Sequence, residues 1–195
     1  RGGSWPRISI VTPSFNQAQF IEETIRSVLL QGYPRLEYFV IDGGSTDGTV
    51  AVIRKYERWL SGWVSEPDRG QAHALNKGFE KCTGDLLGYL NSDDVYFPDA
   101  LSRVGADASE IDDPEKVWLC YPVEDFDESG PWRSVTQRGS GLLVDWILPR
   151  MALHQPGVFW SSAIWRFCGG FDERLHLAFD RDLLMRAIAG GARLT

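Results

Sequence analysis

The amino-acid sequence predicts an α/β fold in which helices cover both faces of a mainly parallel sheet. From residue 8 to residue 94, strand-like and helix-like patterns alternate in the order β-α-β-α-β-α-β. A polar or acidic loop follows each strand-like run, and right-handed crossovers bring such loops to one edge of a parallel sheet. The length of 195 residues and the hydrophobic content of 43% suit a single domain over residues 1–195 with a sizeable core.

The first two strands are expected at residues 8–11 and 36–41, which are rich in β-branched and aromatic side chains. Turn residues 12–16 end the first strand. A helix is predicted over residues 20–29, because apolar side chains recur there at spacings of three and four and acids occupy the first turn. The second strand leads into a glycine-rich turn at residues 42–49.

A helix over residues 50–60 follows this turn, then a short third strand at residues 63–65 and a helix over residues 71–81. The glycines of the turn match neither the dinucleotide-binding pattern G-x-G-x-x-G nor the P-loop. Dinucleotide binding and P-loop ATPase chemistry are therefore disfavoured.

The fourth strand, residues 86–90, is a short apolar run of the kind buried on both faces of a sheet. It ends on Asn91 and Ser92, followed by two adjacent carboxylates, Asp93 and Asp94. Ligands bind at the carboxyl ends of strands in open α/β sheets, and a hard divalent cation relieves the repulsion between paired carboxylates. Asp93 and Asp94 are therefore candidate metal ligands; the alternative is an exposed acidic turn.

The second half of the chain is less regular. Residues 124–141 are polar and weakly patterned, which predicts a loop or short antiparallel strands. Asp180 and Asp182 lie at or near the start of the last helix, where acids favour the helix dipole. The remaining elements are expected at residues 100–111 (helix), 117–122 (strand), 146–153 (short helix), 158–160 (strand), 167–173 (turn), 183–189 (helix) and 192–195 (start of a strand).

Composition limits the partners and the location. A net charge of -7 argues against general binding to nucleic acid or anionic membranes. No apolar run approaches the roughly 20 residues of a membrane-spanning helix, so no integral membrane segment is expected. The three cysteines, Cys82, Cys120 and Cys168, show no metal or redox spacing and are expected to be reduced thiols. We expect a cytoplasmic location, with peripheral attachment at the inner face of the membrane as the alternative.

Five motifs occur in the order in which one enzyme family carries them, and together they cover nearly the whole chain. The chain resembles the family-2 inverting glycosyltransferases, members of the nucleotide-diphospho-sugar transferase superfamily with the GT-A fold. The motifs are residues 8–16, residues 40–49, residues 65–70 with 74–78, the metal motif at residues 90–94, and residues 169–173 followed by 179–183 and Arg186.

This resemblance implies a Rossmann-like three-layer sandwich with a nucleotide-sugar donor half at residues 1–94 and an acceptor half at residues 95–195. It implies a metal-dependent transfer, with inversion, of a sugar from a UDP-, dTDP- or GDP-linked donor to a glycan, lipid or protein acceptor. Members often continue beyond the point at which this chain ends, so C-terminal truncation is expected. The oligomeric state stays open.

The implied catalytic residues are carboxylates. The departing diphosphate gains charge, so Asp93 and Asp94 are expected to bind Mn²⁺ or Mg²⁺, which prefer hard oxygen ligands. The acceptor hydroxyl must lose a proton, so Asp180 is expected to be the base, with Asp182 as the alternative. Asp172 is expected to be a turn acid.

The implied donor-binding residues are Pro13, Phe15, Asp42, Asp68, Gln71 and Asp93. Asp42 can accept from the imino N–H of uracil, thymine or guanine; its alternative role is to cap the turn at residues 46–49. Phe15 is expected to stack on the base and Pro13 to shape the same pocket. Asp68 and Gln71 are expected to line the nucleoside or sugar side, with helix capping as the alternative for Asp68.

The sequence departs from the family pattern at three positions. Phe179 precedes Asp180 where many members have Glu, and Asn91 begins the metal motif in place of Asp. Leu75 stands where many members have an Arg. Arg69 and Lys77 are therefore the candidate cations for the diphosphate.

Two other functions compete with this interpretation. A sugar-1-phosphate nucleotidyltransferase shares the fold type, but it would need a glycine-rich basic loop after the first strand, and residues 12–16 contain no Lys or Arg. A non-catalytic nucleotide- or carbohydrate-binding module would not need Asp93, Asp94 and Asp180 together.

Overall fold

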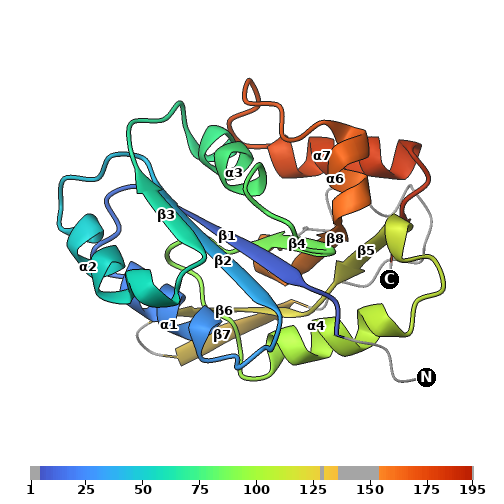
Figure 1. Ribbon diagram of the computed structural model, residues 1–195, viewed down its shortest axis with the longest axis horizontal. Helices are drawn as coiled ribbons and strands as arrows, with labels where there is room; N and C mark the ends of the chain where they lie inside the picture. Colours follow the sequence, from blue (N-terminus) through green and yellow to red (C-terminus); the bar gives the residue numbers. More distant parts are fainter. Residues whose placement is uncertain (1–4, 128–129, 136–153, 195) are drawn as a thin grey trace.

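A computed structural model describes residues 5–127, 130–135 and 154–194 of the chain (Figure 1). Its main sheet has seven strands in the order β3-β2-β1-β4-β8-β5-β9. The strands are β1 (Ile8–Ser14), β2 (Leu36–Asp42), β3 (Gly62–Ser65), β4 (Leu86–Tyr89), β5 (Val117–Cys120), β8 (Val158–Ser161) and β9 (Arg193–Leu194).

The sheet is mainly parallel, as the sequence predicts. β1 lies at its centre and pairs in parallel with β2 and with β4, so that Ile8 is opposite both Leu36 and Leu86. β3 continues the parallel arrangement beside β2. β8 alone among the described strands runs in the opposite direction, and it pairs antiparallel with β4 and β5. The loops that follow β1, β2, β3 and β4 therefore meet at one edge.

Helices cover both faces of the sheet (Figure 1). Along β2, Tyr38 and Val40 pack into one core, and Phe39 and Ile41 pack into the other, because successive strand residues point to opposite faces. The first face is covered by α1 (Ile21–Leu29), α2 (Thr49–Tyr56) and α4 (Ala100–Ser109), and the second by α3 (Gln71–Phe79), α6 (Ser162–Cys168) and α7 (Phe179–Ala189).

The weakly patterned segment contains an antiparallel pair, β6 (Val123–Asp127) and β7 (Gly130–Val135), one of the two outcomes expected for it. Three short 3-10 helices complete the described elements: η1 (Glu57–Trp59), η2 (Pro114–Lys116) and η3 (Gln155–Gly157). The short helix expected at residues 146–153 lies outside the described residues. In the part of the chain that the structure describes, no helix combines the length and apolarity needed to cross a membrane.

Two expectations near the C-terminal helices were wrong. The sequence prediction placed no helix between the strand at residues 158–160 and the turn at residues 167–173, but α6 begins at Ser162, with the Ser161 side chain accepting from the Ile164 amide at 3.2 Å. The predicted turn therefore overlaps the end of α6, and Gly169 ends the helix at φ 73°. α7 begins at Phe179, four residues before the predicted start, so Asp180 and Asp182 both lie in its first turn.

Candidate active site

A cavity of about 320 Å³ lies beyond the ends of β1 and β4. It gathers five of the six predicted donor-binding residues, because the loops after these parallel strands meet at the same edge. Asp42 is not among its lining residues. The cavity, here called the donor pocket, is lined by Pro13, Ser14, Phe15, Gln17, Asp68, Gln71, Ala74, Asn91, Ser92 and Asp93.

Phe15 and Asp68 flank the backbone of Gly43. Phe15 is 61% exposed, so its ring is open to a ligand in the donor pocket. A Cβ atom at position 43 would lie 2.7 Å from Asp68 Oδ2 and 3.4 Å from Phe15 Cδ2. Glycine at position 43 therefore leaves room for an aromatic face and a carboxylate oxygen directly beside the loop after β2.

Asp42 is fully buried and its carboxylate is occupied by its own loop. Oδ2 accepts from the Gly44 and Ser45 amides at 3.1 and 2.9 Å and from Ser65 Oγ at 2.6 Å. Oδ1 accepts from Ser45 Oγ at 2.5 Å. Asp42 thus braces the loop that carries Gly43 and ties it to β3. Asp47, and not Asp42, accepts from the Thr49 amide, at 3.0 Å.

The N-terminus of α3 forms a wall of the donor pocket through Gln71 and Ala74. Its N-cap is Gly70, which offers no side-chain oxygen to the first amides of the helix. Asp68 Oδ1 accepts from the Gly70 amide at 2.8 Å, and Gln71 Nε2 donates to Asn91 Oδ1 at 2.6 Å. An anion in the pocket would therefore meet the positive end of the helix dipole.

Asp93 and Asp94 face different cavities although they are neighbours. The turn after β4 is closed by the Asp94 amide, which donates to the Asn91 carbonyl at 3.1 Å. Asp93 is exposed and lines the donor pocket, whereas Asp94 is half-buried and lines a second cavity. Burial and then the charge of Asp93 raise the pKa of Asp94 to about 6. A divalent cation would relieve both effects.

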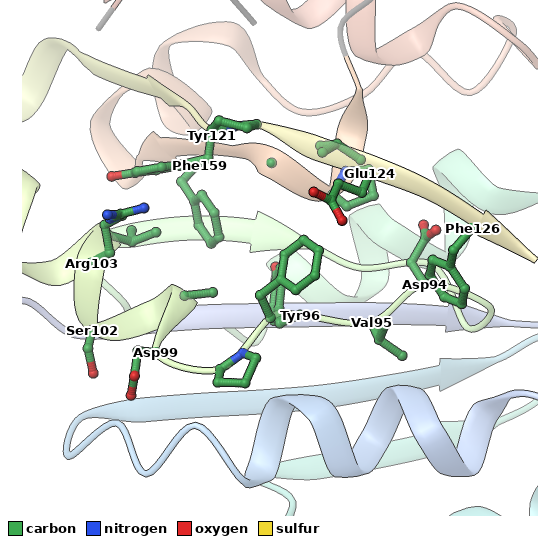
Figure 2. Close-up of a pocket in the computed structure, with 18 residues that line it drawn as sticks. Asp94, Val95, Tyr96, Asp99, Ser102, Arg103, Tyr121, Glu124, Phe126 and Phe159 are labelled. Atoms are coloured by element: carbon green, nitrogen blue, oxygen red, sulfur yellow. The ribbon is translucent and has the colours of Figure 1, made fainter. Parts of the chain in front are cut away.

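The second cavity has a volume of about 530 Å³ and lies among α4, β6, η3 and β8 (Figure 2). The described residues contain no group of three or more His, Cys, Asp or Glu side chains that could hold a metal ion. Asp93 and Asp94 therefore fit a cation that takes its other ligands from water or a bound phosphate, as Mg²⁺ commonly does.

Asp180 lies in the first turn of α7 beside Tyr89, Trp118 and Gln155, and these residues line a small cavity of about 10 Å³. Asp180 Oδ1 accepts from the Arg181 amide at 2.7 Å. Asp180 thus adjoins a small internal space on the α7 side of the sheet.

Asp182, the alternative base, is engaged by Arg186. Its Oδ2 accepts from Arg186 Nε at 2.9 Å and from Nη2 at 2.5 Å. The same guanidinium donates to the carbonyls of Cys168 and Gly170, so Arg186, with Asp182 as its partner, holds α7 to the end of α6. Asp172 is paired with Arg174, whose hydrogen bonds lower the pKa of Asp172 to about 2.

Tyr89 lines the small cavity together with Asp180, a position that the sequence did not indicate. Burial raises the pKa of the Tyr89 phenol well above its usual value, and the charges of Asp180 and then Asp94 raise it further. In the sequence, Tyr89 is only a tyrosine at the end of a buried strand, and such a residue usually belongs to the core.

The two candidate cations both have carboxylate partners. Arg69 Nη2 lies 2.5 Å from Glu173 Oε2, and Lys77 Nζ lies 2.8 Å from Glu66 Oε1. Asn76, to which the sequence assigned no role, exchanges hydrogen bonds with the Phe171 backbone at 2.9 and 3.0 Å. These contacts tie α3 to the segment that leads to α7.

The profile of the family described as "Glycosyl transferase family 2" matches residues 9–170, most of the chain. The chain belongs to glycosyl transferase family 2. The family-2 assignment covers the donor pocket, the Asp93–Asp94 turn and the segment up to the end of α6.

Relatives support the same family. An uncharacterized glycosyltransferase of Mycobacterium tuberculosis (strain H37Rv) is 30% identical to this family-2 chain, and the match covers 94% of this chain and 70% of the relative. The Bacillus subtilis (strain 168) protein TuaG, whose name assigns it to teichuronic acid biosynthesis, is 37% identical over 101 residues, or 50% of this chain and 40% of TuaG.

Solved structures show that this family-2 chain has the GT-A fold. Staphylococcus aureus TarS 1–349 in complex with UDP superposes with a TM-score of 0.76 at 21% identity, over 96% of this chain and 56% of TarS 1–349. The mannosyltransferase PcManGT of Pyrobaculum calidifontis, in complex with GDP-Man and Mn²⁺, gives 0.73 at 24% identity, over 98% of this chain. The chain spans about half the length of these two structures, 56% and 54%.

Proposed function

We propose that the protein is a metal-dependent, inverting glycosyltransferase that moves a sugar from a nucleotide-diphospho-sugar to a glycan, lipid or protein acceptor. One observation carries the proposal: side chains from three separate loops converge on one pocket beside the Asp93–Asp94 turn. Residues of this kind, with an exposed ring, hydrogen-bonding groups and a carboxylate, suit a nucleotide better than a purely structural role.

The nucleoside is expected to lie between Phe15 and Asp68. The exposed Phe15 ring can stack on the base, and Asp68 Oδ2 can accept from an imino N–H. Uracil, thymine and guanine carry such an N–H, and the TarS and PcManGT structures contain UDP and GDP-Man, respectively. Asp42 is expected to act indirectly in nucleoside binding, because its hydrogen bonds fix the loop that carries Gly43.

The diphosphate is expected to lie between the start of α3 and the Asp93–Asp94 turn. Arg69 and Lys77 are paired with Glu173 and Glu66, so the N-terminus of α3, which forms a wall of the pocket, is proposed to supply partial positive charge to the diphosphate. Asp93 and Asp94 would hold Mn²⁺ or Mg²⁺, which stabilises the charge that develops on the leaving diphosphate.

Asp180 is the proposed base. It lines a small cavity with Tyr89, at the end of the strand that leads to the Asp93–Asp94 turn, and its competitor Asp182 is held by Arg186. Asp180 would take the proton of the acceptor hydroxyl as that oxygen attacks the anomeric carbon from the face opposite the leaving group. A single displacement of this kind inverts the configuration.

The test is thermal unfolding with UDP, GDP, dTDP and ADP, each with and without Mn²⁺. One diphosphate should stabilise the protein in a metal-dependent way, by about 2.7 kcal/mol at one hundred times its dissociation constant. The stabilisation should be lost in Asp93→Asn and kept in Asp112→Asn, which removes an exposed carboxylate outside the three cavities.

Product analysis completes the test. Release of a nucleoside diphosphate from the donor, with an inverted glycoside as product, supports the proposal. Release of pyrophosphate would instead identify a nucleotidyltransferase, and binding without turnover would identify a binding module. No stabilisation by any nucleotide would refute the donor site.

A further inference from the structure

The charges exposed on the last two helices differ from those of the whole chain, which carries a net charge of -7. Between residues 162 and 194, every charged Lys, Arg, Asp or Glu side chain that is exposed to solvent is an arginine, whereas the aspartates and the glutamate there are half-buried. The exposed arginines are Arg166, Arg174, Arg181 and Arg193. This part of the surface is therefore positive on an otherwise acidic protein.

Two of these arginines keep their charge available for a partner. Arg174 Nη2 lies 2.7 Å from Asp172 Oδ2, so the charge of Arg174 is largely compensated. Arg166 and Arg181 take part in no ion pair within the described residues, and Arg166 Nη1 donates instead to the neutral Ser162 Oγ at 3.2 Å. An anionic partner could therefore approach Arg166 and Arg181 without displacing a carboxylate.

Large apolar side chains are exposed beside these two arginines. Leu177 is 97% exposed, Phe167 is 68% exposed and Met185 is 39% exposed. Arg181 and Met185 are four residues apart on α7 and therefore share one side of that helix, and Leu177 lies two residues before the helix begins. A Cβ atom at Gly190, the C-cap of α7, would overlap the Phe167 ring, so Phe167 lies at the other end of the same helix.

The two helices thus form one surface that is both apolar and basic. α6 and α7 lie next to each other on the same side of the sheet (Figure 1), and Arg186 of α7 donates to the Cys168 carbonyl at the end of α6. We call this region the α6–α7 surface, and it consists of Arg166, Phe167, Leu177, Arg181 and Met185.

We propose that the α6–α7 surface docks on an anionic lipid bilayer, with Leu177 and Phe167 entering the interfacial layer and Arg166 and Arg181 contacting lipid phosphates. A soluble polyanion would use the arginines but would leave the apolar side chains in water. An uncharged protein surface would cover the apolar side chains but would leave the arginines unpaired. An anionic bilayer takes up both kinds of side chain, because it offers negative headgroups above an apolar layer.

The inference goes beyond the proposed transferase function and does not depend on it. Leu177 precedes Asp180 by only three residues. Docking through Leu177 would therefore hold the segment that carries the proposed base close to the lipid headgroups.

Co-sedimentation tests the basic part of the surface, with vesicles of phosphatidylcholine alone and of phosphatidylcholine mixed with phosphatidylglycerol. The wild type should bind the anionic vesicles about tenfold more tightly than the neutral vesicles, and high salt should weaken this binding. Arg166→Gln/Arg181→Gln should bind the anionic vesicles about twentyfold more weakly, or roughly fivefold for each arginine. The matched control Arg54→Gln/Arg58→Gln, which removes two exposed arginines of α2 and η1, should bind like the wild type.

Leu177→Ser tests the apolar part of the surface. It should bind the anionic vesicles about tenfold more weakly, because one leucine side chain no longer enters the apolar layer. Leu30→Ser is its matched control, since Leu30 is 75% exposed at the end of α1, and it should bind like the wild type. All four variants change exposed side chains, so thermal unfolding should show the wild-type midpoint.

Three results would overturn the inference. The first is a wild-type protein that does not bind anionic vesicles or that binds neutral vesicles equally well. The second is full binding by Leu177→Ser beside a loss in Arg166→Gln/Arg181→Gln, which would indicate a soluble polyanion as the ligand. The third is an equal loss in the control variants. None of these results bears on the nucleotide titration, whose failure would refute only the proposed function.

Discussion

At the scale of single residues, the contacts of two neighbouring carboxylates on α7 favour Asp180 over Asp182 as the proposed base. Asp180 accepts from a backbone amide beside a small cavity, whereas Asp182 accepts twice from Arg186. We predict that Asp180→Asn lowers kcat about 10²–10⁴-fold without a change in stability, the usual range for a general base.

Asp182→Asn is the matched control for this prediction. It should retain turnover and reduce the free energy of unfolding by about 1 kcal/mol, because the ion pair with Arg186 is partly exposed. Release of nucleoside diphosphate and urea unfolding would be measured on both variants. A folded Asp182→Asn protein without turnover, beside an active Asp180→Asn, would reverse the assignment.

Gly43 provides a second prediction at this scale. A Cβ atom there would meet the flexible carboxylate of Asp68 and the edge of Phe15, so Gly43→Ala should fold with nearly the wild-type stability. It should nevertheless displace both side chains and weaken nucleotide binding about tenfold. Isothermal titration with the stabilising diphosphate would measure this. Gly62→Ala, whose Cβ would instead meet Phe39 at 3.3 Å, is the control that should bind normally.

The sequence could predict which residues gather at the donor pocket, but not which of them are already engaged. Phe15, Asp68 and Asp93 each follow a strand, and parallel strands bring such positions together. Asp42 also follows a strand, yet Ser45 and Ser65 occupy its carboxylate. Whether a carboxylate at this edge is free or engaged depends on a side-chain contact between residues 42 and 65. Hydrophobic periodicity in the sequence does not predict such a contact.

At the scale of elements, Gly78 sets how closely α3 lies on the sheet. A Cβ atom at this position would overlap Val11 Cγ1 and would lie 3.1 Å from Ile41 Cγ1. We predict that Gly78→Ala destabilises the protein by about 1–3 kcal/mol through overpacking, despite the gain of about 1 kcal/mol in helix propensity. Urea unfolding would measure the change.

A double-mutant cycle would show that the cause is this one contact. Val11→Ala removes the methyl groups that the new Cβ would meet, so Val11→Ala/Gly78→Ala should lose less stability than the sum of the two single variants. Strict additivity would mean that the strain of Gly78→Ala arises elsewhere, for example in the backbone of α3.

The elements best predicted from the sequence are those with a single clear periodicity. β1, β2 and β4 are short apolar runs buried on both faces, and α1 has one apolar stripe. α6 was missed because its seven residues, Ser162–Cys168, contain too few turns to show a stripe and include aromatic side chains that also favour strands. Its real signal was local: the capping serine at Ser161 and the glycine at Gly169.

At the scale of the whole molecule, strand order is the feature that the sequence could not supply. β8 lies between β4 and β5 in the sheet, although 37 residues, 121–157, separate β5 from β8 in the sequence. The insertion places Trp160 against Trp118, with ring centroids 5.3 Å apart, and brings Gln155 to the wall shared with Asp180. Long-range pairing of this kind follows from packing of the complete sheet rather than from local pattern.

The stability of the whole protein should also depend on pH through Asp94. The pKa of Asp94 is raised from 3.8 to about 6, chiefly by burial, so the folded state binds this proton more tightly than the unfolded state. The stabilising contribution is therefore fully present below about pH 4 and is lost as pH rises through about 6, by up to about 2–3 kcal/mol in the metal-free protein. Lowered pKa values at Glu37 and Glu173 act in the opposite direction, but below about pH 4.5.

A bound cation should reverse the dependence on Asp94, because Mn²⁺ favours the charged carboxylate. We predict that the metal-free wild type loses free energy of unfolding between about pH 5 and pH 7 relative to Asp94→Asn, whereas stabilisation of the wild type by Mn²⁺ with the bound diphosphate grows over the same range. Urea unfolding of both proteins at several pH values, with and without metal and nucleotide, measures how the free energy of unfolding changes with pH in each of the four cases. Parallel slopes for wild type and Asp94→Asn without metal would show that Asp94 titrates normally. A wild-type protein whose stabilisation by Mn²⁺ and diphosphate did not change with pH would place the metal on other ligands.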